Sequence, residues 1–368
     1  MASSIRKAQS PLSCQLCDNP NVIKWKCVDC KLLMCDNCKE RIHPRFKLSE
    51  KHSILSIKDV GKKEIDISAQ FGSLQISQPV ISSLLSTYTS NFTSFGKIQY
   101  SGNDTLYCSS HSKEFGYKFF IIRLLKESIK VLQELDIECT DFALGIKNEI
   151  FYGQFHGSEL KVLSTDGVTN TVLSTSPMLI LCTHINKDNE ITLGLREQGS
   201  PFPVTEFRTR LIVVFDVNNK RKLSIECDQN GEKLFSYVWR ISTDSYNNIY
   251  AIDQFENYDG RIVALERSGG VKFFYKGHDS VNTPETPFNP IGIVITETNI
   301  IIVCDERNDS LHALNTKGEL IGLQTLTDLG VIYPCSLCLD SEGFLLIGCN
   351  SRVNEAIDAK IHVTKISL

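Results

Sequence analysis

Residues 14–52 carry a regular array of cysteine and histidine, Cys14-x2-Cys17-x9-Cys27-x2-Cys30-x4-Cys35-x2-Cys38-x4-His43-x8-His52. The array contains six cysteines and two histidines, and its cysteines form three Cys-x2-Cys pairs. A two-residue gap folds into a tight turn that directs both sulfur atoms towards one ion, so each pair supplies half of a site. Structural zinc takes four cysteine or histidine ligands. The eight residues therefore predict two structural zinc sites.

Two alternatives concern these cysteines and histidines: disulfide bonds in place of zinc, and two ways of pairing the zinc ligands. The cysteines could instead form a disulfide framework, but disulfides require an oxidising compartment, and residues 1–13 contain no apolar run typical of an export signal. The zinc ligands could be paired alternately or sequentially along the chain, because both schemes satisfy the ligand count. Spacing alone leaves the pairing open.

The order of pairs and gaps in residues 14–52 resembles a B-box zinc finger, with all eight ligand positions present. Alternate pairs share an ion in that family. The resemblance therefore implies one zinc held by Cys14, Cys17, Cys35 and Cys38, and a second zinc held by Cys27, Cys30, His43 and His52.

A domain as short as residues 14–52 buries too little apolar surface to fold on its own. Zinc binding in small finger peptides contributes about 10–16 kcal/mol, which substitutes for the missing core. Because all eight ligands are used, neither ion keeps an open position for water or substrate. The expected role of both ions is structural and not catalytic.

The composition is typical of a globular protein with reduced thiols. The chain has 368 residues, of which 42% are hydrophobic and 22% charged. Its longest apolar runs are far too short to span a bilayer, and its 14 cysteines occur without an export signal. We therefore expect no membrane association and a cytoplasmic or nuclear location.

Charge is distributed unevenly along the chain. Residues 1–60 contain 11 Lys and Arg against 6 Asp and Glu, whereas the remainder contains 28 against 37. The basic residues near the cysteine array are best explained as a solvated face that accompanies the zinc sites. An acidic body argues against extensive contact with a phosphate backbone, although one basic face would still allow it.

The N-terminal part departs from the tripartite-motif family in two respects. We expect residues 1–13 to form a disordered tail and residues 53–78 to form a linker. The linker shows no heptad pattern, so it does not predict the long coiled coil that follows the B-box in that family. No cysteine precedes Cys14, so no RING finger is predicted either. Ubiquitin-ligase activity and coiled-coil dimerisation are therefore in doubt, and we expect a monomer or weak oligomer.

Residues 79–368 repeat a pattern of short apolar strands separated by turn residues. The clearest unit spans residues 238–276, with a Gly-Gly turn before its last strand. Second strands are predicted to begin near residues 105, 150, 191, 249, 300 and 344. Six units of this length are typical of four-stranded propeller blades. The fold class is therefore mainly β, a small zinc-stabilised B-box followed by a six-bladed β-propeller.

The last repeat has only three clear strands, so residues 79–88 are predicted to supply its fourth strand and close the ring. The region resembles the six-bladed propellers of NHL-repeat (NHL/TolB-like) proteins. Asp253 and Asp305 match the aspartate that ends the second strand of such repeats.

No motif for catalysis is found in residues 79–368. Cys335-x2-Cys338 has metal-ligand spacing, but residues three apart face opposite sides of a strand. A ring of Asp and Asn binding Ca2+, as in some propeller hydrolases, is a minor alternative to turn capping. Several further cysteines are interpreted as small core residues: Cys108, Cys139, Cys182, Cys227, Cys304 and Cys349.

The interpretation of the whole chain is a zinc-binding, non-catalytic adaptor that recruits protein partners through a propeller face. Resemblance to the tripartite-motif family implies a link to ubiquitin signalling or innate immunity. One alternative is an RNA-binding post-transcriptional regulator, and another is a subunit of a ubiquitin ligase. The longest insertion within a repeat, residues 196–210, presents Phe202 and Phe207 as candidate partner-binding residues.

Overall fold

A computed structural model describes residues 14, 16–17, 23–27, 32–45, 52, 54–56, 78–112, 116–126, 128–139, 141–205, 207–351 and 358–368. The chain divides into two compact units, Met1–Ile76 and Ser77–Leu368. The predicted tail and most of the predicted linker lie outside the described residues. No helix in the described part of the chain is long and apolar enough to cross a bilayer.

The smaller unit is built on a three-stranded antiparallel sheet with the order β2-β1-β3. β1 (Trp25–Cys27) lies between β2 (Leu33–Met34) and β3 (Ile54–Ser56), and helices α1 (Asp36–Arg41) and η1 (His43–Arg45) follow β2. The fully or nearly buried residues of its core are mostly cysteines: Cys14, Cys27, Met34, Cys35 and Cys38. The other described apolar residues that pack against this core, Leu16, Trp25, Leu32, Ile42 and Ile54, are only partly buried.

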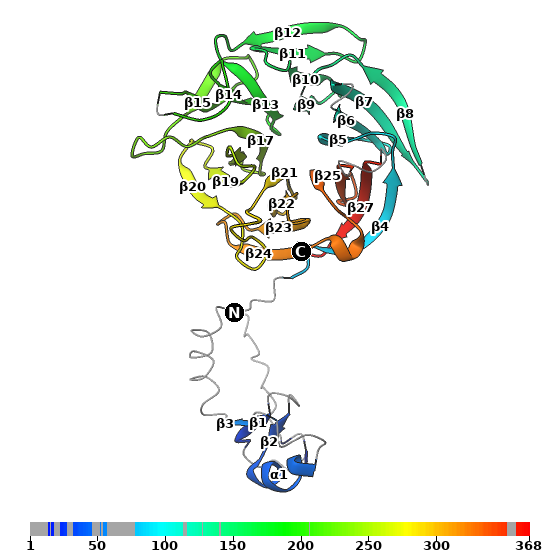
Figure 1. Cartoon of the computed structure of the whole chain (residues 1–368), viewed down its shortest axis with the longest axis vertical. Helices are drawn as coiled ribbons and strands as arrows, with labels where there is room; N and C mark the ends of the chain where they lie inside the picture. The colour runs from blue at the N-terminus through cyan, green and yellow to red at the C-terminus, as the bar shows by residue number, and fades with distance from the viewer. Residues whose placement is uncertain are drawn as a thin grey trace, which may run out of the picture. The chain divides into compact units, whose positions relative to one another are not determined.

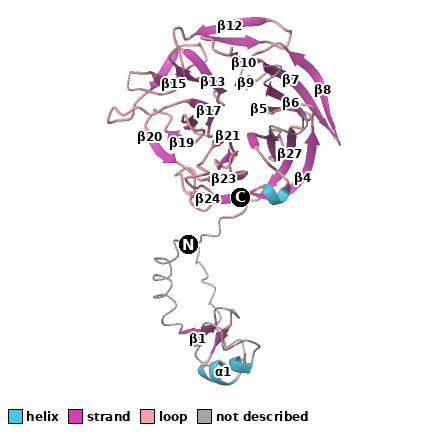
Figure 2. Ribbon diagram, in the orientation of Figure 1, coloured by secondary structure: helices cyan, strands magenta, loops and turns pink. Residues whose placement is uncertain are grey.

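The larger unit is a ring of six four-stranded antiparallel sheets (Figure 1). Strands account for nearly all of its regular structure (Figure 2). Blade one contains β5 (Lys97–Gly102), β6 (Thr105–Ser112), β7 (Gly116–Leu125) and β8 (Ser128–Leu135). Blade two contains β9 (Phe142–Leu144), β10 (Ile150–Gly153), β11 (Glu159–Leu163) and β12 (Thr169–Ser174). Blade three contains β13 (Leu179–Ile185), β14 (Ile191–Arg196), β15 (Arg210–Phe215) and β16 (Arg221–Ile225).

The second half of the ring repeats this arrangement. Blade four contains β17 (Val238–Thr243), β18 (Ile249–Gln254), β19 (Gly260–Leu265) and β20 (Val271–Tyr275). Blade five contains β21 (Pro290–Ile295), β22 (Ile301–Asp305), β23 (Ser310–Leu314) and β24 (Leu320–Thr325), and helix η3 (Thr327–Leu329) follows it. Blade six contains β25 (Pro334–Leu339), β26 (Leu345–Cys349), β27 (Lys360–Ile366) and β4 (Ile81–Thr89).

The prediction of six blades is confirmed, and the observed second strands begin within one residue of the predicted positions. The predicted closure is also confirmed, because β4 from the start of the propeller pairs antiparallel with β27 at its end, from Thr89↔Lys360 to Ile81↔Ile366. Closure joins the two ends of the propeller in one sheet and leaves no open gap in the ring.

Turn residues explain why the strands begin where they do. An asparagine with positive φ precedes the second strand of blades two to five, namely Asn148, Asn189, Asn247 and Asn299, with φ of 60–62°. Gly343 takes the equivalent place in blade six with φ of 82°. Asparagine and glycine tolerate this left-handed conformation better than other residues. The repeated turns therefore set the start of each second strand.

Apolar clusters join each blade to the next. Between blades three and four, for example, Cys182 and Ile212 pack with Val238 and Val263, all fully buried. Equivalent clusters occur at each of the five other junctions of the ring. Because every blade is covered by neighbours on both sides, its loops and outer strand are the parts left to meet a partner.

Candidate metal centres and partner-binding loop

Four cysteines of the smaller unit form one group. The Sγ atoms of Cys14, Cys17, Cys35 and Cys38 all lie within 4.8 Å of one another. The Cys17 and Cys35 Sγ atoms are 3.9 Å apart, and the Cys35 backbone N–H donates to Cys14 Sγ at 3.4 Å. Ligands of a tetrahedral zinc at Zn–S distances of about 2.3 Å would be separated by about 3.8 Å. The donor set and its spacing therefore fit a zinc ion.

A second group contains Cys27, His43 and His52, whose ligand atoms also lie within 4.8 Å of one another. Cys27 Sγ is 3.8 Å from His52 Nδ1. Cys30, the fourth ligand implied by the B-box resemblance, lies outside the described residues. The described residues bring together the pairs Cys14/Cys17 and Cys35/Cys38, which is the alternating grouping and not the sequential one.

Helix α1 positions two ligands of the first group. Cys35 immediately precedes the helix and Cys38 lies within it. Asp36 fixes the helix against β1, because it accepts hydrogen bonds from Lys24 Nζ at 2.5 Å and from Trp25 Nε1 at 2.7 Å. The hydrogen bond from Lys24 also lowers the pKa of Asp36. Lys39 Nζ lies 3.4 Å from the centroid of the Trp25 ring.

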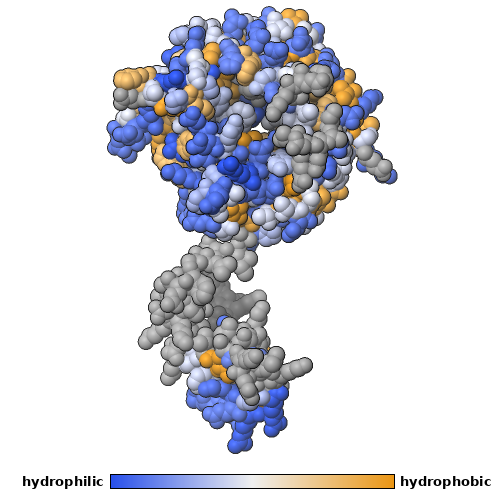
Figure 3. Space-filling view, in the orientation of Figure 1, coloured by the Kyte–Doolittle hydropathy of each residue, from blue (hydrophilic) through white to orange (hydrophobic). Residues whose placement is uncertain are grey.

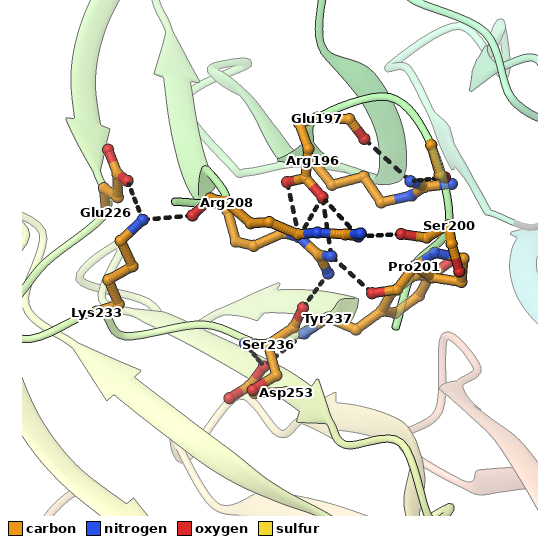
Figure 4. Close-up of polar contacts among 12 residues, drawn as sticks. Arg196, Glu197, Ser200, Pro201, Arg208, Glu226, Lys233, Ser236, Tyr237 and Asp253 are labelled. Atoms are coloured by element: carbon orange, nitrogen blue, oxygen red, sulfur yellow. Dashed lines mark hydrogen bonds and ion pairs between the residues drawn. The ribbon is translucent and has the colours of Figure 1, made fainter. Parts of the chain in front are cut away.

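The insertion of blade three, between β14 and β15, is held by polar contacts that include Glu197, Pro201 and Ser236 (Figure 4). Arg210 is 1% exposed and forms a bidentate ion pair with Glu197, with N–O distances of 2.9 and 3.0 Å. It also donates to the carbonyl oxygens of Pro201, at 2.6 Å, and Ser236. One guanidinium thus links both ends of the insertion to the start of blade four.

Arg196 holds the first turn of the same insertion. It is 2% exposed, and its Nη1 donates to the carbonyl oxygens of Glu197 and Gly199 at 2.9 and 2.8 Å. Burial lowers the pKa of the Arg196 guanidinium. Burial is the largest single influence on Glu197 and opposes its ionisation, but the hydrogen bonds from Arg210 and from its own backbone N–H, together with the charges of Arg210 and Arg208, lower the pKa of Glu197. Charged hydrogen bonds therefore fix the described part of the insertion.

The two predicted partner-binding phenylalanines have different environments. Phe207 is 87% exposed, the largest exposed fraction among the large apolar side chains described. The Phe202 ring is partly buried and lies 5.9 Å from the Tyr237 ring, measured between centroids. Burial raises the pKa of Tyr237. Only Phe207 is free to act as an anchor without a packing role.

A buried charge cluster at the innermost strands of the propeller was not predicted from the sequence. Asp141, with 1% of its side chain exposed, lies 2.6 Å from Lys97 Nζ and 3.6 Å from Arg240 Nη1. Arg240 in blade four also donates to the Gly96 carbonyl oxygen in blade one at 3.0 Å. Because these blades lie on opposite sides of the ring, the Arg240 side chain crosses its centre.

This charge cluster occupies the centre of the ring, where a ring of Asp and Asn was considered as an alternative Ca2+ site. Two cations and one carboxylate meet at the centre, which is a poor donor set for a divalent cation. Asp253 instead accepts from the backbone N–H groups of Ser236 and Tyr237 and pairs with Arg261 at 3.1 Å. Within the described ranges, the two groups of the smaller unit are the only sets of three or more His, Cys, Asp or Glu placed to share a metal ion.

Most propeller cysteines are buried in the described structure. Cys335 and Cys338 are both buried, and Cys335 Sγ hydrogen-bonds to the carbonyl oxygens of Phe95 and Gly348. Cys227 was predicted to be a core residue, and this prediction is wrong because its side chain is exposed. It forms an isolated bridge with Lys233 in the connection between blades three and four, where no neighbouring blade covers it.

Comparison with known proteins identifies the fold but no family. No family model matches the sequence, and no curated protein matches it. A putative gluconolactonase aligns with a TM-score of 0.54 and 12% identity, covering 78% of this chain and 95% of the other. A protein of unknown function from Bacteroides thetaiotaomicron aligns with a TM-score of 0.52 and 13% identity, covering 79% and 74%. A luciferin-regenerating enzyme aligns with a TM-score of 0.51 and 12% identity, covering 74% and 92%. At these identities the similarity shows a shared propeller fold alone.

Proposed function

We propose that this protein is a zinc-stabilised, non-catalytic adaptor that recruits a protein partner through the loops on one face of its propeller. The proposal depends chiefly on the grouping of Cys14, Cys17, Cys35 and Cys38. A closed set of four thiolates leaves a bound ion no free position, so the ion would cross-link the small unit and perform no chemistry. A B-box identity for this unit is part of the proposal.

The propeller supports the same proposal through its blade-three insertion. Arg196 and Arg210 anchor residues 197–201 of the insertion, which would lower the cost of ordering this loop when a partner binds. An ordered loop that presents an exposed aromatic ring is a typical recognition element. Phe207 is the proposed anchor.

The first test is the metal content of the purified full-length chain. We expect two zinc ions per chain, because the eight predicted ligands form two four-ligand sets. Elemental analysis after dialysis against metal-free buffer measures this number. A content of one zinc or none would contradict the two-site proposal.

The second test concerns Phe207. We expect Phe207→Ala to weaken capture of the partner by more than about 1 kcal/mol, or roughly fivefold, while leaving the melting temperature unchanged. The recovered partner is identified by mass spectrometry, and its Kd is then measured for each variant. Phe202→Ala should instead lower the melting temperature, since that ring packs against Tyr237.

Tyr258→Ala is the matched control for this test. Tyr258 is 76% exposed and lies in the equivalent connection of blade four, between β18 and β19. We expect this variant to bind the partner as the wild type does. If Phe207→Ala and Tyr258→Ala have equal affinities, the blade-three insertion is a spacer and not the recognition element.

A further inference from the structure

A cavity with apolar walls opens between blades three and four, which are neighbours in the ring (Figure 1). It lies at the opposite end of β14 from the blade-three insertion, and Val214, Leu223 and Ile249 form its apolar walls. Its volume is about 300 Å³ with the open space at its mouth included, which is the lower limit of known ligand pockets. The described side chains on the face seen in Figure 3 are mostly hydrophilic. The cavity therefore offers one apolar ring more contact than that open surface does.

Small side chains in blade three explain why the cavity exists. Thr192 is the second residue of β14, and the second residue of β18 in blade four is Tyr250. Leu223 and Phe273 likewise share the third position of β16 and β20. Tyr250 is fully buried between blades four and five, with its ring 6.3 Å from that of Phe273 and its hydroxyl donating to Asp244 at 3.0 Å. Two aromatic rings thus fill the space that stays open one junction earlier.

A hydrogen-bond acceptor in the cavity also lacks the partner that its counterpart has. Asn247 and Asn299 hold the same left-handed turn position in blades four and five. Asn299 Oδ1 accepts from the Ser245 backbone N–H at 2.9 Å. Asn247 is 2% exposed and lines the cavity; its Nδ2 donates to Asp188 at 2.6 Å, but its Oδ1 has no partner among the described residues. Because an unpaired buried acceptor is unfavourable, a ligand that brings a donor gains affinity here.

The charged groups at the mouth of the cavity neutralise one another. Lys222 and Arg267 both pair with Glu190, and Arg267 also lies 3.2 Å from Asp188. The two cationic side chains are 45% and 47% exposed, so they lie at the opening and not in the interior. A cationic ligand would meet Lys222 and Arg267, and an anionic ligand would meet the buried Glu190. The cavity therefore favours an uncharged ligand.

We propose that this cavity binds a single uncharged phenol ring, supplied either by a small phenolic ligand or by a tyrosine side chain of a partner protein. The ring would pack between Val214, Leu223 and Ile249, as the Tyr250 ring packs in the next junction. Its hydroxyl would donate to Asn247 Oδ1. The site is separate from the blade-three insertion and from both groups of predicted zinc ligands, so it does not depend on the adaptor function.

The test is a ligand-observed NMR titration of the full-length protein with p-cresol, which is the tyrosine side chain without its backbone. Toluene has the same ring and methyl group but lacks the hydroxyl. We expect p-cresol to bind at least tenfold more tightly than toluene, because only p-cresol can donate to Asn247. Benzoate and benzylammonium should also bind at least tenfold more weakly than p-cresol, since each brings a net charge.

Three variants locate the binding. Thr192→Tyr gives blade three the side chain that blade four carries at this position, so it should fill the cavity, abolish p-cresol binding and leave the melting temperature at or above that of the wild type. Val168→Tyr adds a tyrosine at a site of blade two that is 50% exposed, and it should bind p-cresol as the wild type does. Tyr250→Thr should open an equivalent cavity between blades four and five, lower the melting temperature and bind p-cresol at two sites per chain.

A capped peptide of alanines around one tyrosine distinguishes the two sources of the ring. Binding at least tenfold tighter than that of p-cresol assigns the site to a partner's tyrosine, and equal or weaker binding assigns it to a small phenol. Equal affinity for p-cresol and toluene would overturn the proposal, as would p-cresol binding that survives in Thr192→Tyr or is undetectable at millimolar concentration in the wild type. If Thr192→Tyr melts below the wild type, Leu223→Phe, which supplies the other ring of blade four, decides in its place.

Discussion

Cys38→Ser is expected to destroy one zinc site, to destabilise the smaller unit and to reduce the zinc content from two ions to one. Cys38 is fully buried within α1, and it belongs with Cys14 and Cys35 to the five buried residues of the described core. The substitution leaves a three-ligand site. In small finger peptides, zinc binding contributes about 10–16 kcal/mol to the free energy of folding, so loss of one ligand is expected to have a large effect. Elemental analysis and limited proteolysis of the full chain measure the two effects.

The propeller should not be affected by this change. Its stability comes from the apolar clusters between blades, so the β-sheet circular dichroism and its melting temperature should match those of the wild type. Cys227→Ser, which replaces an exposed cysteine of the propeller, is the matched control and should retain two zinc ions. A Cys38→Ser protein that still held two ions would contradict the four-cysteine site.

Cobalt substitution distinguishes the two pairing schemes in the same variant. With alternating pairs, Cys38→Ser destroys the four-sulfur site and leaves the site that contains His43 and His52. With sequential pairs, it destroys the histidine site and leaves four sulfurs. The intensity of the thiolate-to-cobalt absorption in the remaining site is greater for four sulfurs than for two, so a strong remaining band would contradict the alternating arrangement.

Asp141→Asn is expected to destabilise the propeller by about 3–5 kcal/mol, the usual cost of breaking a buried ion pair by removing one partner. The side chain is 1% exposed, lies 2.6 Å from Lys97 and 3.6 Å from Arg240, and accepts from the Thr183 backbone N–H at 2.9 Å. Asparagine keeps the size of the side chain but leaves two cations facing each other without a counter-ion. Urea unfolding followed by circular dichroism measures the loss.

Two further variants make the Asp141 result specific. Asp279→Asn removes an exposed aspartate and should change the free energy of unfolding by less than about 0.5 kcal/mol. Adding Lys97→Met to Asp141→Asn removes one of the unpaired cations, so the double variant should be more stable than the sum of the single changes indicates. Strict additivity would show that the three side chains do not act as one cluster.

The repeating parts of this protein could be derived from its sequence, because they depend on local spacing. Turn residues such as Asn148 and Asn247 recur before each second strand, and their left-handed backbone fixes where a strand can start. The pattern therefore located six second strands to within one residue and the closing strand at residues 79–88. The Cys-x2-Cys pairs likewise defined the candidate ligands, since two ligands of a turn must face one ion.

Only the tertiary structure decided which distant residues meet. Asp141, Lys97 and Arg240 come from blades two, one and four, and nothing in their local sequence shows that ring closure brings them together. Packing of the blade-three insertion against Tyr237 partly buries Phe202 and leaves Phe207 exposed. Local propensity sets strands and turns, whereas exposure and charge pairing depend on contacts between blades that are far apart in the chain.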